Sequence, residues 1–292
     1  MLSYSEIKTR YQEKTKDTTT ANQSLIAERA NQIVNLICAT TDFTFLQETY
    51  TTVTVASQQA YDLPANCRKI ESVMVTVDSQ KYPLQPIEST EIWDQYNVDT
   101  ADTTDYPQYY YKEEGSIYLW GIPATAGNTI TIRYLKRPVA MSNTDYATGS
   151  ITATNASTTI EGAGTTFTGT TVNENTKIKI KGVLYDVASI TDADTLVLTK
   201  KYQGTTAATL TYTLGDYPII PEEFQDLLWV RPAKEYYAFN KEQQSMYLML
   251  KDMDAELEGK LILSQRTKGV SNVIKRKRQK IRSVNDYPSD LT

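Results

Sequence analysis

Three carboxylates in one loop are the first residues whose type and spacing could do chemistry. Asp99, Asp102 and Asp105 recur at every third position of a Thr-rich segment. A hydrolase that works with paired carboxylates would need two such groups near one another. No other motif in the sequence supports such a hydrolase, so we expect a solvated loop here.

A second acidic group suggests a calcium loop. Asp192 and Asp194 follow Asp186 within nine residues, but the glycine and the distal glutamate of an EF-hand are missing at the required spacing. Aspartate favours turns, and ITDADT lies between two apolar runs, which predicts a β-turn. The Gly162-Ala163-Gly164 segment lacks the third glycine and the following helix of a dinucleotide-binding fingerprint.

The absence of histidine narrows the possible chemistry further. The 292 residues include no His, which excludes His-dependent triads and most zinc sites. Two cysteines, Cys38 and Cys67, could pair, but they make no disulfide framework and favour a reducing compartment. Cys38 lies beside an apolar helical stripe, which predicts a buried thiol. We therefore expect no enzyme activity, no metal and no cofactor.

The strongest local charge feature is a basic arm near the C-terminus. Six of the eight positions from Lys275 to Arg282 are cationic: Lys275, Arg276, Lys277, Arg278, Lys280 and Arg282. Residues 271–292 carry a net charge of +4, and the rest of the chain carries −9. Interleaved Ile274 and Ile281 favour docking on a protein surface, while DNA contact and a solvated tail are the alternatives.

Helical periodicity marks both ends of the chain. Ser3 and Glu6 form a capping box, and an apolar stripe from Ile26 to Ile37 predicts a second helix. From Glu222 to Gln265 the pattern is helical again, with an expected kink or break at Pro232, near Trp229. The stripe predicts helix core or subunit-interface positions at Phe224, Leu228, Tyr236, Tyr247, Leu250, Leu257 and Leu261.

Between the helical ends the period changes to that of strands. Short strand-like runs such as TTVTVAS, KIESVMVTVDS and TITIRYLKRP fill residues 43–145. Residues 146–215 are richer in Thr, Ser and Gly, and they predict a small all-β module inserted between host-like flanks.

These patterns predict an α+β fold. We expect a helical bundle built from the N- and C-terminal helices, an antiparallel β domain, and an inserted small all-β module. The expected division is 1–42 N-terminal helices, 43–145 β domain, 146–215 inserted module, 216–269 C-terminal helices and 270–292 basic arm. No apolar run approaches the ~20 residues that span a bilayer, and no secretory signal is recognisable, so a soluble protein made in the cytosol is expected.

The order of several segments resembles a known family. Five segments carry the resemblance: AYDLPANCRKIESVMV, YPLQPIESTEIWDQY, YPQYYYKEEGSIYLWGIP, TITIRYLKRP and IIPEEFQDLLW. Their order resembles that in the head-to-tail connector or adaptor proteins of tailed bacteriophages, including the tail tubular protein A type of short-tailed phages. The resemblance covers most of residues 1–145 and 216–266.

The resemblance implies a virion protein without catalytic activity. Such adaptors form a ring, typically of twelve copies, under the portal protein. The ring extends the DNA channel without sequence-specific DNA binding and carries the tail nozzle or tube and the tail fibres. A tail adhesin that binds carbohydrate is the alternative, favoured by the Thr- and Tyr-rich β module, and a carboxylate-dependent hydrolase is a weaker one.

Overall fold

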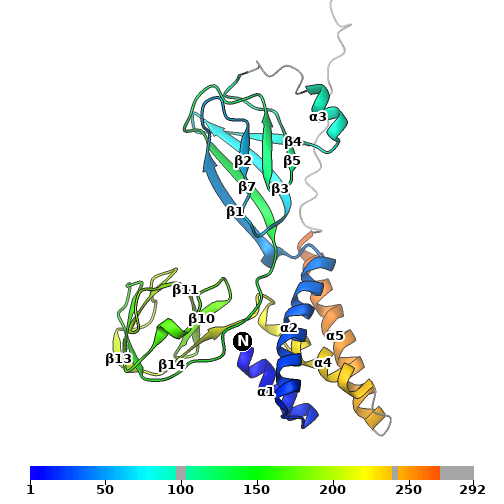
Figure 1. The fold of residues 1–292 in the computed structure, drawn as a ribbon, viewed down its shortest axis with the longest axis vertical. Helices are drawn as coiled ribbons and strands as arrows, with labels where there is room; N and C mark the ends of the chain where they lie inside the picture. Colours follow the sequence, from blue (N-terminus) through cyan, green and yellow to red (C-terminus); the bar gives the residue numbers. More distant parts are fainter. Residues whose placement is uncertain (97–102, 239–242, 270–292) are drawn as a thin grey trace, which may run out of the picture.

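The fold is a mixed α+β arrangement of helices and two curled, largely antiparallel sheets. It is described by a computed structural model that covers residues 1–96, 103–238 and 243–269. Figure 1 shows the first sheet at one end of the molecule, with the N- and C-terminal helices and the second sheet side by side at the other. The expected fold class is therefore confirmed at the level of an α+β protein with two sheets.

Four helices lie together: α1 (Tyr4–Thr15), α2 (Thr20–Thr40), α4 (Leu227–Ala238) and α5 (Gln244–Gly269). The predicted capping box starts α1, because the Ser3 hydroxyl accepts from the Glu6 amide and the Glu6 carboxylate accepts from the Ser3 amide. Helix α4 lies against the other three helices, so it forms the centre of the helical part. Figure 1 shows that α2 and α5 run in the same direction, toward the first sheet.

Apolar contacts and ion pairs hold α5 to α4. Leu250 and Leu261 of α5 are buried among residues of α1, α2 and α4. The Arg231 guanidinium donates to Asp254 at 2.6 Å, and both side chains are almost fully buried. Lys234 also pairs with Asp254. The Arg231 guanidinium also pairs with Glu258 at 2.7 Å, so a small network of ion pairs, rather than a single pair, joins the two helices.

The expected break of the helix at Pro232 is wrong. A short 3-10 turn, η3 (Glu222–Phe224), precedes α4, which then runs without interruption through Pro232 to Ala238. Pro232 lacks the N–H that would bond to the Leu228 carbonyl. Its ring is nevertheless buried beside Val230 and Ala233, so tertiary packing outweighs the local preference.

The first sheet has seven strands in the order β1-β7-β3-β4-β5-β6-β2. All its pairs are antiparallel except β4 with β5. The strands are β1 (Gln47–Val53), β2 (Ala60–Asp62), β3 (Cys67–Val77), β4 (Gln80–Ile87), β5 (Tyr109–Glu113), β6 (Ser116–Trp120) and β7 (Thr129–Lys136). The 3-10 turn η1 (Thr44–Leu46) leads into β1, and helix α3 (Thr90–Tyr96) follows β4.

Strand β3 shows how the sheet curls. It pairs with β7 along most of its length, with register shifts at Cys67/Lys69 and Ile70/Ser72, but with β4 only from Val73 to Val77. Bulges of this kind bend a strand and increase its twist. Strands β3 and β4 therefore diverge on the N-terminal side of Val73.

The second sheet also has seven strands, in the order β13-β8-β9-β12-β11-β10-β14. They are β8 (Ser150–Ala153), β9 (Thr159–Ala163), β10 (Thr176–Ile180), β11 (Val183–Ile190), β12 (Thr195–Leu198), β13 (Ala207–Leu210) and β14 (Tyr212–Asp216), with a 3-10 turn η2 (Phe167–Gly169). This sheet has its own apolar core around Phe167, Ile178 and Leu196.

Strand β9 was missed by the sequence pattern. Its TIEGA segment alternates weakly, and Gly162 obscures it. A Cβ on Gly162 would lie 2.1 Å from the Thr165 hydroxyl oxygen, so this glycine permits a close approach of the loop that follows β9.

Candidate functional site

The acidic residues considered for calcium binding stabilise a turn or pair across two strands instead. Asp192 accepts from the Asp194 amide at 2.9 Å, and Asp194 accepts from the Thr165 hydroxyl at 2.7 Å. Asp186 pairs with Lys177 on the neighbouring strand. Within the described ranges, no group of three or more Cys, Asp or Glu side chains could hold a metal ion.

The Thr-rich loop gives a similar result for the one carboxylate that can be placed. Asp105 accepts from the amide and the hydroxyl of Thr125, at 2.7 and 2.8 Å. Asp99 and Asp102 lie outside the described residues.

Both cysteines are buried and free. Burial raises the pKa of the Cys38 thiol to about 12 and also raises the pKa of Cys67. Because the thiolate is the reactive form, both side chains behave as small apolar residues at neutral pH.

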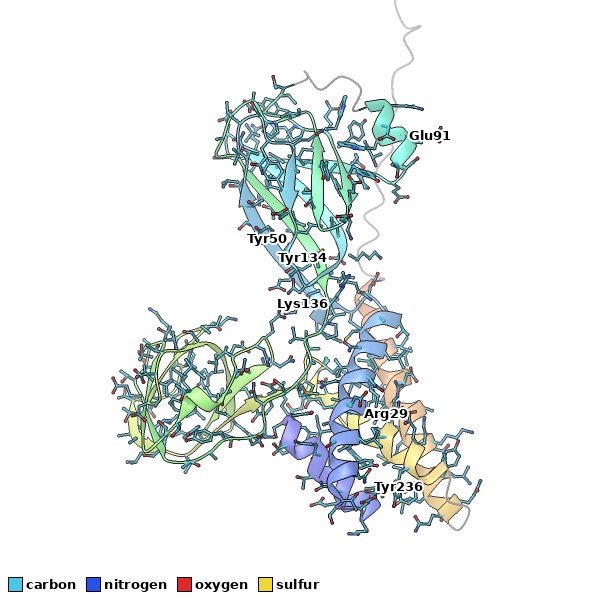
Figure 2. All side chains as sticks on the ribbon, viewed as in Figure 1. Arg29, Tyr50, Glu91, Tyr134, Lys136 and Tyr236 are labelled. Atoms are coloured by element: carbon cyan, nitrogen blue, oxygen red, sulfur yellow. The ribbon has the colours of Figure 1, made fainter. Side chains whose placement is uncertain are left out.

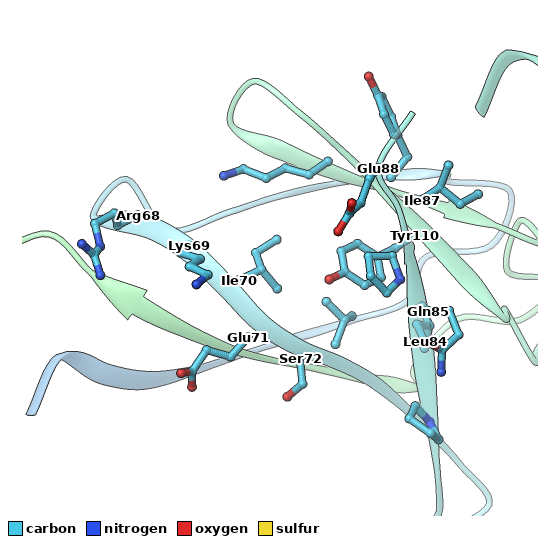
Figure 3. Close-up of a pocket in the computed structure, with 15 residues that line it drawn as sticks. Arg68, Lys69, Ile70, Glu71, Ser72, Leu84, Gln85, Ile87, Glu88 and Tyr110 are labelled. Carbon is cyan, nitrogen blue, oxygen red and sulfur yellow. The ribbon is translucent and has the colours of Figure 1, made fainter. Parts of the chain in front are cut away.

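A hollow of about 590 Å³ lies where β3 and β4 diverge. Its lining includes Arg68, Lys69 and Glu71 along β3, with Glu88 and Tyr110 nearer β4 (Figure 3). Arg68 and Lys69 both pair with Asp42, at 2.6 Å, and Arg68 also donates to the Cys38 carbonyl at the end of α2. These two cations therefore join the first sheet to the helical part.

Buried polar contacts join the second sheet to the segment that precedes it, and Asp216 is at their centre. Its carboxylate accepts from the amides of Ser142 and Asn143 at 2.7 and 3.0 Å, and from the side chains of Asn143, Asn173 and Thr176 at 2.8, 3.1 and 2.9 Å. Burial alone would raise the pKa of Asp216, but these hydrogen bonds together hold it below its usual value. The ionised carboxylate thus ties both ends of the second sheet together.

A second carboxylate joins the same region to α1. Asp145 accepts from the Ser3 hydroxyl at 2.6 Å, and its amide donates to the Ser5 hydroxyl at 2.9 Å. Its other carboxylate oxygen is buried without a hydrogen-bond partner among the described residues. Burial, supported by the nearby Glu6 carboxylate, raises the pKa of Asp145 against the hydrogen bond from Ser3. Folding therefore favours the ionised form of Asp216 and the protonated form of Asp145.

A third contact joins the two sheets directly. Lys136, at the end of β7, pairs with Glu174 at 2.8 Å. The Asn66 amide donates to the same Glu174 at 2.7 Å, and Asn66 accepts from the Tyr134 hydroxyl at 3.0 Å. Figure 2 shows Tyr134 and Lys136 at the end of the first sheet that faces the other two parts. We call the contacts of Asp216, Asp145 and Lys136 the joint.

The joint connects the second sheet to the helices and to the first sheet through directional polar contacts. Sequence reasoning missed the joint, because single Asp and Lys residues in linkers carry no periodic signal.

The helix positions expected in a core or interface lie in three environments. Four are buried: Phe224, Leu228, Leu250 and Leu261. Tyr247 and Leu257 are half-buried, and Tyr236 is 38% exposed near the end of α4 (Figure 2).

The expected docking arm cannot be placed in the same way. Its residues lie outside the described part of the chain: Ile274, Lys275, Arg276, Lys277, Arg278, Lys280, Ile281 and Arg282.

Comparison with known families identifies the class of protein. Residues 2–159 match the family model described as SU10 adaptor protein, which is more than half of the chain. The protein is therefore a phage adaptor. It belongs to the SU10 adaptor protein family. No curated protein matches the sequence.

The match agrees with part of the expected resemblance. It includes the N-terminal helices and the whole first sheet, and it continues into β8 of the second sheet. It does not extend to the C-terminal helices.

Membership in a phage adaptor family supports a location in the virion. Among the described helices, none combines the length and apolar character needed to cross a bilayer.

Proposed function

We propose that this chain is a head-to-tail adaptor that forms a ring under the phage portal. The ring, typically of twelve copies, would extend the DNA channel and carry the tail nozzle or tube and the tail fibres. The match to the adaptor family over residues 2–159 carries this proposal. The tail tubular protein A type of short-tailed phages is the specific relative that the segment order favours.

The expected division of the chain fits this role. In the proposed adaptor, the helices of 1–42 and 216–269 form the bundle from which the ring is built. The β domain of 43–145 and the inserted module of 146–215 project from it. The joint supports this view, because it gives each part a defined orientation, which a repeated ring contact requires.

The charge distribution supports a DNA conduit. Outside residues 271–292 the chain carries a net charge of −9, so a channel made of many copies would repel passing DNA. Each phosphate that a cation neutralises increases affinity and would slow passage.

The basic arm is proposed to dock on an acidic surface of the portal. Truncation after Gly269 is expected to weaken binding to purified portal and to reduce its salt dependence. Unchanged binding across a salt series would exclude the arm from docking. If the truncation abolished only DNA binding, the arm would be a channel contact instead.

Catalysis forms no part of the proposed function. The lack of His, the structural roles of the described loop carboxylates and the high pKa of Cys38 support this view.

The ring is tested by measuring the mass and shape of assemblies of the full-length chain. Mass photometry and negative-stain microscopy, alone and with purified portal, should show closed rings, or rings that form on portal only. A stable trimeric fibre, or a monomer that never associates with portal, would contradict the proposal.

A further inference from the structure

Helix α2 presents an exposed stripe that no other described element covers. Leu25 and Leu36 are 49% and 58% exposed, and they lie eleven residues apart on the same face. Arg29 and Gln32 lie between them on this stripe, also exposed. At 1.5 Å per residue the two leucines are about 16 Å apart along the helix.

Helix α5 presents a comparable stripe on the side away from α4. Leu248 and Leu263 are 48% and 59% exposed. Asp252, Ala255 and Gly259 lie between them on the same face. Nothing lies within 4 Å of a Cβ built on Gly259, so the stripe has an open notch at this residue.

The two stripes match when they are aligned in parallel. The fourth residue after Leu25 is Arg29, and the fourth after Leu248 is Asp252, so a cation faces an anion. Leu36 lies eleven residues after Leu25, and Gly259 lies eleven residues after Leu248, so Leu36 faces Gly259.

Small residues let the two helices approach closely there. Leu36 would fill the notch over Gly259, between Ala255 and Leu263. An antiparallel alignment would leave Arg29 opposite Ala255 or Gly259, without an anion.

We propose that the α2 stripe of one subunit packs against the α5 stripe of a second copy of this chain. Arg29 already contacts Glu235 of its own α4 at 3.7 Å, and Asp252 of the second copy would add a second carboxylate to the same guanidinium. The contact is heterologous, since it uses two different surfaces, and such contacts generate rings when the rotation closes.

The parallel direction follows from the fold and from the ring. In Figure 1, α2 and α5 of one subunit run in the same direction. A rotation about an axis along the helices keeps that direction, so α2 and the neighbouring α5 stay parallel. In this respect the inference rests on the proposed ring.

Disulfide trapping tests the register of the contact. The double variant Leu25→Cys with Leu248→Cys should give a ladder of crosslinked oligomers on a non-reducing gel after mild oxidation. The native cysteines are buried, so they should not react. The mismatched pair Leu25→Cys with Leu263→Cys, and each single variant, should stay monomeric on the gel.

A second variant tests the notch at Gly259 without disturbing the packing of the subunit itself. Gly259→Leu has room in the isolated subunit and suits a helix better than glycine. It should leave the melting temperature unchanged or raised, while reducing the assembled fraction at least tenfold. Gly259→Ala, a much smaller change, should reduce assembly less.

The outcomes separate this inference from the proposed function. Rings from the unmodified chain, together with no ladder from the matched pair, would overturn the interface and leave the ring intact. A ladder from the mismatched pair, or dimers from a single variant, would also overturn it. Neither rings nor a ladder, even with portal present, would overturn both.

Discussion

Two carboxylates of the joint show how the surroundings of a residue decide its role. Asp216 accepts five hydrogen bonds, so its ionised form is favoured, whereas Asp145 has a buried oxygen without a partner among the described residues. Hydrogen bonds lower the pKa of Asp216 despite burial, and burial raises the pKa of Asp145. The two residues should therefore contribute to stability with opposite dependence on pH.

Replacing Asp216 should destabilise the protein. In Asp216→Asn the amide group would face donors that need an acceptor, so the free energy of unfolding should fall by about 2–3 kcal/mol at pH 7. Because the folded pKa is lowered, the wild-type contribution is present above the unfolded value near ~4 and is lost as pH falls through the folded pKa. Urea denaturation from pH 7 to pH 3 measures both effects. The exposed Asp78→Asn is the control, and an equal loss in both variants would contradict the prediction.

Replacing Asp145 should have the opposite result. Because its folded pKa is raised, its contribution to stability is greatest below the unfolded pKa and is lost as pH rises through the folded pKa. Asp145→Asn removes the buried charge, so its melting temperature at pH 7 should equal or exceed that of the wild type. The difference should shrink as pH falls and disappear below the unfolded pKa near ~4. A lower melting temperature at pH 7 would show that the carboxylate stabilises the joint.

At the scale of elements, packing decides which helical positions matter. Leu248 and Leu250 are two residues apart on α5, yet Leu248 is exposed and Leu250 is fully buried against α4. The same principle explains why α4 continues through Pro232, since buried neighbours hold the turn that the proline weakens.

This contrast gives a matched pair of substitutions. Leu250→Ala should lower the free energy of unfolding by about 2–5 kcal/mol, because it creates a cavity in the helical part. Leu248→Ala should change it by less than about 0.5 kcal/mol in the monomer, as expected for a surface position. Chemical denaturation of dilute protein measures both. Similar effects at the two positions would mean that α5 does not pack on α4 as described.

At the scale of the whole molecule, three parts meet at one joint. The chain enters and leaves the second sheet at one point, since the amide of Tyr146 donates to the Leu214 carbonyl at 2.7 Å and the amide of Leu214 donates back at 2.8 Å. The second sheet has its own core and shares no strand with the first.

The second sheet should therefore be removable. Replacing residues 146–215 with a short Gly-Ser linker closes a gap between neighbouring chain ends, so little loop entropy is added. We expect the remaining chain to unfold in one cooperative transition, monitored by circular dichroism during heating. The loss of Asn173 and Thr176 from the joint should lower the melting temperature by a few degrees. A non-cooperative transition would show that the first sheet and helices depend on the second sheet.

The sequence alone determined much of the local structure. Ser3 and Glu6 placed the start of α1, and strand-like runs indicated most of the first sheet, because capping and burial of alternate side chains are local requirements. The first strand was placed too late, since β1 is Gln47–Val53 and the TTVTVAS run extends beyond its end. Segment order also pointed to a phage adaptor, which the family match confirms. Strand β9 escaped detection, since Gly162 is there for a close approach that the local pattern does not encode.

Only the tertiary structure decided how these elements are joined. The roles of Asp216, Asp145 and Lys136 depend on partners far away in the sequence, such as Thr176, Ser3 and Glu174. The exposed stripes of α2 and α5 likewise appear only once α4 is seen to cover their other faces. Burial and charge pairing depend on which segments meet in space. A periodic pattern predicts which face of a helix is apolar, but it does not predict which element packs against that face.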